Sequence, residues 1–342
     1  MGDSNPRPSV LETDALPTEL NSSSCVGLRQ DAGEIKGECS GLVANSPLRH
    51  SYRAIEQKAR LHMQQTDIAA WIGHYAARPW LHVPGVDMAP ALAVPSMLTQ
   101  EESQLYHWIG LNAAGCGATI DLGAFAGGSA ARLLQGLHLG GKPHHLHAYD
   151  RFTASADARA RFLSPGGVAL TRDENILPLV QRLLAPWQAN LTLYPGDIAA
   201  KVWSGDPVEI LAIDAGKSPG LTDHIAAQFF GALVPGQSLV IHQDFGHATQ
   251  GWLAVQMQHL AGYFTPLAYV APDCVVFLCT APVDAAAIAA ARTEGLSDDA
   301  LIAGILAAAD RFAPLIKHRR FDAMIAKVRA NPGVRKAWQM RN

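Results

Sequence analysis

A glycine-rich turn stands where the chain could hold a ligand. The strand-like run from Ala118 to Leu122 leads into the segment from Gly123 to Ser129, and an alanine- and leucine-rich helical stretch follows. Glycines let the backbone approach a ligand closely, and the first turn of a helix presents unpaired N–H groups and the positive end of its dipole. The segment is therefore predicted to be a ligand-binding turn between a strand and a helix.

The residues of this turn narrow the choice of ligand. The dinucleotide fingerprint needs a glycine two residues after the first, and Phe125 stands there, where its side chain would crowd a pyrophosphate. A P-loop needs Lys-Ser or Lys-Thr after its second glycine, and Gly128 is followed by Ser129 and Ala130. These departures disfavour a dinucleotide and a nucleoside triphosphate, and they leave a nucleoside ligand of smaller charge.

Carboxylates stand at or near the ends of four of the five predicted parallel strands, at Asp121, Asp150, Asp214 and Asp244. Ligands of open α/β sheets gather outside the carboxyl ends of the strands, so four acids at that edge predict a site. Asp150 follows the glycine turn at about the spacing at which an acid accepts hydrogen bonds from ribose hydroxyls. The alternative role of Asp150 is to cap a helix at the end of its strand.

The acid before the turn and the Gly-x-x-x-Gly spacing resemble the first motif of class I S-adenosylmethionine-dependent methyltransferases, over about residues 96–282. The resemblance implies that the loop from Asp121 to Ser129 binds the methionine end of S-adenosyl-L-methionine, that Asp150 binds ribose, and that the loop at Asp197 lies beside adenine. Asp197 could instead cap a helix beginning at the next residue. The implied cofactor-binding residues are Asp121, Gly123, Ala124, Phe125, Gly127, Ser129, Asp150, Arg151, Gly196, Asp197, Ile198 and Asp214.

The segment from Ile213 to Ser218 reads Ile-Asp-Ala-Gly-Lys-Ser and is the second informative motif. It resembles the Asp-Ala-x-Lys stretch of cation-dependent O-methyltransferases of the catechol and caffeoyl-CoA type. That resemblance implies that Asp214 binds a divalent metal and that Lys217 helps to deprotonate the acceptor hydroxyl. The chemistry is consistent, because a hard ion such as Mg²⁺ takes carboxylate oxygens and lowers the pKa of a bound hydroxyl.

The next strand end departs from that family, which has Asp-Asn where this chain has Gln243-Asp244; related sugar and macrolide O-methyltransferases have Asp-Asp. The implied Mg²⁺ ligands are thus Asp214, Asp244 and either the amide oxygen of Gln243 or water. The alternative is that no metal binds and Asp214 contacts the cofactor or the substrate. In that case His242 or His247 would be the general base, because imidazole titrates near neutrality, although either could be a structural histidine.

Alternating strand and helix signals predict the elements that position these residues, a doubly wound and mostly parallel sheet of the Rossmann-like α/β class. Two further strand-like runs, Phe264 to Val270 and Cys274 to Cys279, are only a Pro-Asp turn apart. They are too close for a helical crossover and should pair as an antiparallel hairpin at the sheet edge, as in class I methyltransferases, whose seventh strand runs against the others. The other strands are expected at 118–122, 145–149, 191–194, 208–213 and 238–241, and the covering helices at 130–139, 174–187, 221–233 and 249–260.

The flanking sequence divides into three further parts. Residues 1–46 are rich in Pro, Ser, Asn and Gly with little periodicity, which predicts a poorly ordered tail. Residues 47–95 read as a helical cap that ends in a Pro-rich connector from residue 79, and residues 96–282 form the expected methyltransferase domain. Residues 283–342 are expected to be a helical extension, with helices near 285–291, 298–309 and 321–330.

The composition limits the partners. The 342-residue chain has a net charge of −3 and an isoelectric point near 6.5, with no basic stripe that could follow a phosphate backbone, so nucleic acid is not expected. No apolar run reaches the roughly 18 residues of a spanning helix, so we expect no membrane contact and a cytoplasmic location. A small-molecule acceptor is the expected partner, and a homo-oligomer is compatible with the sequence.

The sequence thus predicts an S-adenosylmethionine-dependent methyltransferase that acts on an oxygen of a small molecule, with Mg²⁺ assistance if the acids bind it. Two alternatives stay open. An NAD-dependent oxidoreductase would share the sheet and the ribose-binding acid, and Phe125 is the feature against it. A noncatalytic protein would keep the fold and the cofactor as a binding scaffold.

Overall fold

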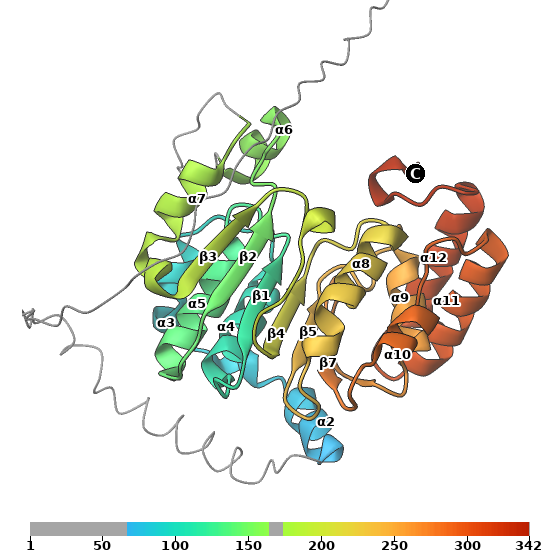
Figure 1. The fold of residues 1–342 in the computed structure, drawn as a ribbon, viewed down its shortest axis with the longest axis horizontal. Helices are drawn as coiled ribbons and strands as arrows, with labels where there is room; N and C mark the ends of the chain where they lie inside the picture. Colours follow the sequence, from blue (N-terminus) through green and yellow to red (C-terminus); the bar gives the residue numbers. More distant parts are fainter. Residues whose placement is uncertain (1–66, 164–173, 342) are drawn as a thin grey trace, which may run out of the picture. The chain divides into compact units, whose positions relative to one another are not determined.

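Seven strands form one sheet in the order β3-β2-β1-β4-β5-β7-β6 in a computed structural model that describes residues 67–163 and 174–341 (Figure 1). Strands β1 to β5 pair in parallel, and β7 runs antiparallel to both β5 and β6. The predicted mostly parallel sheet and the reversed last strand are confirmed. The strands are β1 (Ala118–Leu122), β2 (Leu146–Asp150), β3 (Leu191–Pro195), β4 (Val208–Ile213), β5 (Leu239–His242), β6 (Phe264–Val270) and β7 (Cys274–Cys279).

The strand order reverses between β1 and β4. From β1 the chain moves outward to β2 and β3, and then it returns to place β4 on the other side of β1. In sheets of this kind the crevice at the carboxyl ends of the two strands flanking the reversal is where ligands bind. The glycine turn after β1 and the Asp-Ala-Gly-Lys segment after β4 both lie at this edge.

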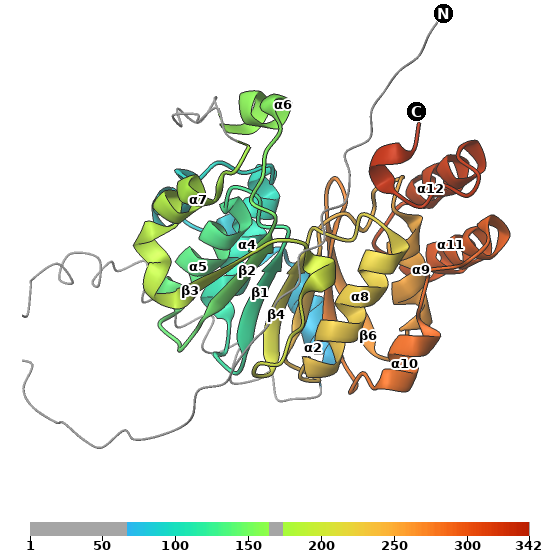
Figure 2. The same ribbon diagram turned by 45° about the horizontal axis from the view of Figure 1, so that its top comes forward.

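Helices cover both faces of the sheet (Figures 1 and 2). One apolar core lies between the sheet and the helices that precede β1 or follow β1 and β2. The other lies between the sheet and the helices after β4 and β5 together with the C-terminal extension. The first group contains α2 (Ile68–Ala76), α3 (Gly85–Leu92), α4 (Gln100–Asn112), α5 (Gly128–Gly140) and α7 (Leu177–Leu183). The second contains α8 (Pro219–Phe229), α9 (Gly251–His259), α10 (Ala285–Ala290), α11 (Asp298–Phe312) and α12 (His318–Ala330).

The segment before α4 differs from the predicted connector. The Pro-rich stretch from residue 79 contains helix α3, with Pro90 inside it, and α5 provides the stabilising contacts. Gln135 donates to the carbonyl of Asp87, and Arg132 donates to the carbonyl of Ala91. Tertiary hydrogen bonds from α5 therefore support this helix although Pro90 has no N–H to donate. The predicted tail over 1–46 and the predicted cap up to residue 66 lie outside the described residues.

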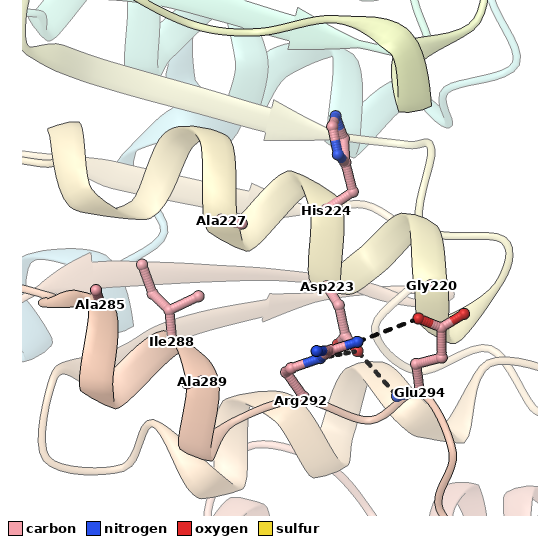
Figure 3. A pocket seen from close by; sticks show the side chains of 9 residues that line it. All are labelled: Gly220, Asp223, His224, Ala227, Ala285, Ile288, Ala289, Arg292 and Glu294. Atoms are coloured by element: carbon pink, nitrogen blue, oxygen red, sulfur yellow. Dashed lines mark hydrogen bonds and ion pairs between the residues drawn. The ribbon is translucent and has the colours of Figure 1, made fainter.

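The C-terminal extension forms the three predicted helices and is attached to α8 through Asp223. This buried carboxylate accepts hydrogen bonds from the backbone N–H groups of Thr293 and Glu294, at 2.8–3.0 Å, and from the Thr293 hydroxyl at 3.1 Å. A cavity of about 470 Å³ lies beside this contact between α8 and α10, with Arg292 and Glu294 at its rim (Figure 3). None of the described helices is long and apolar enough to cross a membrane.

Replacing Asp223 tests this attachment. We expect Asp223→Ala to lower the free energy of unfolding by about 2–4 kcal/mol, because it leaves buried backbone donors without an acceptor. Asp223→Asn should cost less, since its amide oxygen can still accept. Urea unfolding followed by circular dichroism measures both, with Asp310→Ala, an exposed carboxylate of α11, as the control. A loss for Asp223→Ala no larger than that of the control would contradict this interpretation.

Candidate active site

The glycine turn crosses the end of β4 at very short range. Gly123 has φ of +95°, and a Cβ atom on it would lie 2.6 Å from the carbonyl oxygen of Asp214. Only glycine tolerates both the left-handed backbone and this contact. Gly127 has φ of +86° and caps α5, so the loop ends at the helix N-terminus, as the sequence predicts.

The segment from Pro95 to Leu98 lies against the same loop. A Cβ atom on Gly128 would lie 2.5 Å from the carbonyl oxygen of Pro95. Together with Tyr106 and Asp214, this segment and the loop line a partly open pocket. The covering segment therefore packs closely against the loop.

Arg132 holds the chain just before the covering segment. Its Nη1 atom donates to the carbonyls of Ala91, Val94 and Gly128 at 2.9–3.1 Å, and its Nε atom donates to the Ser103 hydroxyl at 3.0 Å. The side chain is buried, so these bonds replace those to water. The sequence analysis missed this residue, because a lone arginine in an apolar helix carries no local signal of its partners.

Asp150 connects β2 to the glycine loop. Its Oδ2 atom accepts from the N–H of Phe125 at 3.0 Å, and its Oδ1 atom accepts from the N–H of Phe152 at 2.7 Å. Helix α6 (Ala156–Ala158) is instead capped by Ser155, so Asp150 is no helix cap. Burial raises the pKa of Asp150, and the two backbone hydrogen bonds oppose that shift. Each carboxylate oxygen retains a lone pair that could accept from a ligand hydroxyl.

Asp121 lies beneath the loop, where it is 2% exposed. Its Oδ2 atom accepts from the Ser129 hydroxyl at 2.7 Å, which fixes the first turn of α5. Burial raises the pKa of Asp121 to about 7, with smaller contributions in the same direction from the charges of Asp214 and Asp150. This placement indicates that Asp121 supports the loop from below.

Lys217 bridges the two acids at the ends of β4 and β5. Its Nζ atom donates to Asp214 Oδ1 at 2.7 Å and also to Asp244 Oδ2. Burial lowers the pKa of Lys217, whereas the negative charges of Asp214 and Asp244 raise it. The two charges together outweigh burial, so the pKa lies above its ordinary value. A protonated amine has no lone pair with which to accept a proton. The arrangement therefore does not support Lys217 as the predicted base.

The two acids respond differently to the shared ammonium group. Burial raises the pKa of Asp214 to about 6, and Lys217 only partly opposes that shift. For Asp244, Lys217 and a hydrogen bond from Gln250 at 2.8 Å outweigh burial, so its pKa is lowered. Asp244 is thus the acid that Lys217 keeps ionised.

Gln243 points toward α4. Its Oε1 atom accepts from the Tyr106 hydroxyl at 3.0 Å, and its Nε2 atom donates to Glu102 Oε1 at 2.5 Å. With this amide engaged and an ammonium group between Asp214 and Asp244, the predicted Mg²⁺ ligands do not fit the arrangement. Among the described residues, no group of three or more histidine, cysteine or acidic side chains could hold a metal ion.

The two candidate histidines lie in different environments. His242 is 1% exposed, and neither of its ring nitrogens has a hydrogen-bond partner. Burial lowers its pKa to about 4, so its expected role as the base does not fit its position inside the second core. His247 is half-buried in the turn after β5, and its Nδ1 atom lies 2.8 Å from the Thr249 hydroxyl.

The predicted adenine side lies at the carboxyl end of β3. Asp197 caps a short 3-10 helix, Ile198–Ala200, by accepting from the N–H of Ala199 at 3.0 Å, and its other oxygen lies 3.2 Å from Arg151. The ion pair is exposed, so it contributes little to stability. Gly196 precedes it with φ of +119°. The cap predicted as the alternative is present, and the cofactor role of these residues stays a prediction.

The C-terminal segment also reaches this edge. The N–H of Ala337 donates to the carbonyl of Lys217 at 3.0 Å. Trp338, next in the chain, is 66% exposed. Sequence reasoning missed this contact and that of Tyr106, because both depend on packing between distant segments. The spacing of Glu102 and Tyr106, one helical turn apart, was the available signal for the second.

Comparisons with known proteins give structural likeness only. No protein-family model and no curated protein matches the chain. It is similar to the solved structure of the O-methyltransferase NovP, with 16% identity, 54% of this chain and 82% of that one covered, and a TM-score of 0.42. It is also similar to the methyltransferase PaMTH1 of Podospora anserina, solved with bound SAH. The identity is 12%, the match covers 70% of this chain and 99% of that one, and the TM-score is 0.38.

The raised pKa of Asp121 predicts a pH-dependent stability. Between its ordinary value of 3.8 and about 7, the unfolded chain releases the Asp121 proton while the folded chain retains it, so stability falls as pH rises through this range. We expect Asp121→Asn to be more stable than the native protein at pH 8 by about 1–3 kcal/mol. The advantage should shrink toward pH 4.

Urea unfolding at a series of pH values measures this difference, with the exposed Asp310→Asn as the control. A difference between Asp121→Asn and the native protein that stays constant from pH 4 to pH 8 would show that Asp121 titrates normally.

Proposed function

We propose that the protein is an S-adenosylmethionine-dependent methyltransferase that acts on an oxygen of a small-molecule acceptor. The observation that carries this proposal is the contact between Asp150 and the glycine loop at the reversal of the strand order. It places a carboxylate with free lone pairs beside a helix N-terminus, which suits a ligand with a ribose at one end and an amino-acid carboxylate at the other.

The sheet favours this cofactor over a nicotinamide dinucleotide. The dinucleotide-binding sheet has the order 3-2-1-4-5-6 with parallel strands. Here β7 is inserted between β5 and β6 and runs against both. Phe125, with φ of +46°, occupies the position where a dinucleotide loop has its second glycine. No observation in the described residues favours the oxidoreductase alternative.

The charges of the site suit a sulfonium ion. Asp150, Asp214 and Asp244 lie at one edge of the sheet, and Lys217 compensates only one of these negative charges. A cationic methyl donor bound there would be attracted electrostatically. When bound, S-adenosylmethionine supplies an electrophilic methyl group, so the protein has only to orient the acceptor in line with it and to accept a proton.

His247 is the proposed proton acceptor. It is half-buried at the ligand edge, whereas His242 is enclosed in the core. The Nδ1 atom of His247 lies 2.8 Å from the Thr249 hydroxyl and 3.3 Å from the Thr249 backbone nitrogen. In the tautomer in which Nδ1 donates to that hydroxyl, Nε2 carries the lone pair that can take a proton. Trp338 and the C-terminal segment beside Lys217 would border the acceptor.

The segment from Pro95 to Leu98 borders the proposed cofactor pocket. That pocket is partly open, and Tyr106, Phe125 and Ser129 also line it. Arg132, on α5, holds the residue that precedes this segment through its hydrogen bond to the carbonyl of Val94.

Cofactor binding tests the proposal directly. We expect Asp150→Asn to weaken binding of S-adenosylhomocysteine by about 10- to 100-fold, because an amide replaces a charged acceptor of ribose hydroxyls. Isothermal titration calorimetry of the full chain measures the affinity. Asp310→Asn should bind as the native protein does.

Thermal unfolding of both variants identifies any loss that arises from a damaged loop. No binding to the native protein would refute the proposed function. Binding with unchanged affinity in Asp150→Asn would refute the ribose assignment alone.

A further inference from the structure

We infer that the ammonium group of Lys217 takes the place of a divalent cation between Asp214 and Asp244, so that the acceptor side of the site needs no metal. The part of this inference that concerns methyl transfer rests on the proposed function. The replacement of the cation is a property of the three side chains themselves, and it can be tested without any turnover.

The lysine is fixed from several sides. Its Nζ atom donates to one oxygen of each acid, and Gln250 donates to the same oxygen of Asp244 at 2.8 Å. Its backbone is held as well. The indole N–H of Trp252 donates to the carbonyl of Gly216 at 2.8 Å, and the N–H of Ala337 donates to that of Lys217 at 3.0 Å. The ammonium group is therefore part of the built site.

Few side-chain oxygen atoms remain that could coordinate a metal ion at this place. Mg²⁺ requires near-octahedral coordination by six oxygens, and a protein site usually offers it carboxylates with room for water. Here the two carboxylates each give an oxygen to the ammonium group, and Gln243 gives its amide oxygen to Tyr106. Glu102, the nearest further acid to Gln243, accepts from that amide and from the N–H of Thr99. A metal would have to displace Lys217 and rearrange Gln243.

The site with the lysine and a site with a divalent ion differ in net charge. Two carboxylates with one ammonium group carry a net charge of −1, whereas two carboxylates with a divalent ion would be neutral. The retained negative charge favours a sulfonium donor close by. The lysine thus neutralises one of the two carboxylates, and the remaining negative charge still attracts the cationic cofactor.

The ammonium group can also assist the acceptor. It has three N–H donors, of which the acids take two, and its side chain is 37% exposed. The third can donate to the acceptor oxygen, which lowers the pKa of that hydroxyl. In the transfer step the oxygen forms a bond to the methyl carbon as the sulfur–carbon bond breaks. The hydroxyl proton passes to His247, and the products are the methyl ether, S-adenosylhomocysteine and an imidazolium ion.

Manganese binding tests the inference. Mn²⁺ is added to the native protein, to Lys217→Ala and to Lys142→Ala, an exposed lysine between α5 and β2 that serves as a matched charge control. Electron paramagnetic resonance counts the free ion, and thermal unfolding reports the stability with and without it. We expect Lys217→Ala alone to gain one site, at least about tenfold tighter than any on the native protein, because two uncompensated carboxylates remain. Its melting temperature should rise with Mn²⁺.

Further variants keep the test decisive. If Lys217→Ala does not fold, Lys217→Met keeps the stem volume and should gain the same site. Stoichiometric binding of Mn²⁺ by the native protein, abolished in Asp214→Asn, would overturn the inference. So would a Lys217 variant that folds and binds Mn²⁺ no better than the native protein.

Calorimetry with S-adenosylhomocysteine on the same native sample separates this inference from the proposed function. If the nucleoside does not bind but Lys217→Ala gains the Mn²⁺ site, the proposed function fails while the replacement of the cation stands. If the nucleoside binds and the native protein also binds Mn²⁺ at Asp214, the function stands and the inference fails.

Discussion

The close approach of Gly123 to the main chain of Asp214 is the constraint on which the site depends. Because β1 and β4 are neighbours, the turn leaving β1 must cross the end of β4, and only a residue without a side chain fits there. This crossing sets the ligand loop on one side and the Asp214–Lys217–Asp244 bridge on the other. The two halves of the proposed reaction, cofactor binding and acceptor activation, are therefore positioned by one contact.

Buried charges hold the irregular segments around this crossing. Asp150 accepts from the loop, Arg132 donates to three carbonyls, and Asp223 accepts from the backbone before α11. Glu209, on β4, accepts from three consecutive N–H groups at residues 114–116. Backbone groups of loops have no partner strand or helix, so side chains must satisfy them where water is excluded. These residues explain how a protein with long connections keeps a defined ligand edge.

Most of the fold could be predicted from the sequence, because its strands are short apolar runs that end at turn residues. The hairpin at 264–279 was clear, since the three residues between its strands leave no room for a crossover. Helix α3 was missed because Pro90 signals a break locally, while the hydrogen bonds that support the helix come from α5. The ends of the strands were predictable to about one residue, because a turn residue follows each apolar run. The conformations of the loops were not predictable, because they depend on contacts with distant segments.

The candidate site could be predicted only as a set of residues at one edge. Sequence spacing placed Asp150, Asp214 and Asp244 together, since parallel strands share their carboxyl edge. It could not show that Lys217 would lie between two of them, because that depends on a side-chain conformation. It also could not show that Tyr106 and the segment at Ala337 reach the same edge, since those contacts span more than a hundred residues.

The end of strand β5 determines where the side chains of the three residues after Ile241 point. His242 points to the core beneath α9, where it is buried and cannot exchange protons with solvent or substrate. Gln243 points to the opposite face and hydrogen-bonds to Glu102 of α4. Asp244 lies beyond the strand, where pleating no longer applies, and turns back to Lys217. A histidine that could serve as a base must therefore lie in the turn and not in the strand, and His247 is the histidine that satisfies this condition. The chemistry of this edge thus follows from where β5 ends.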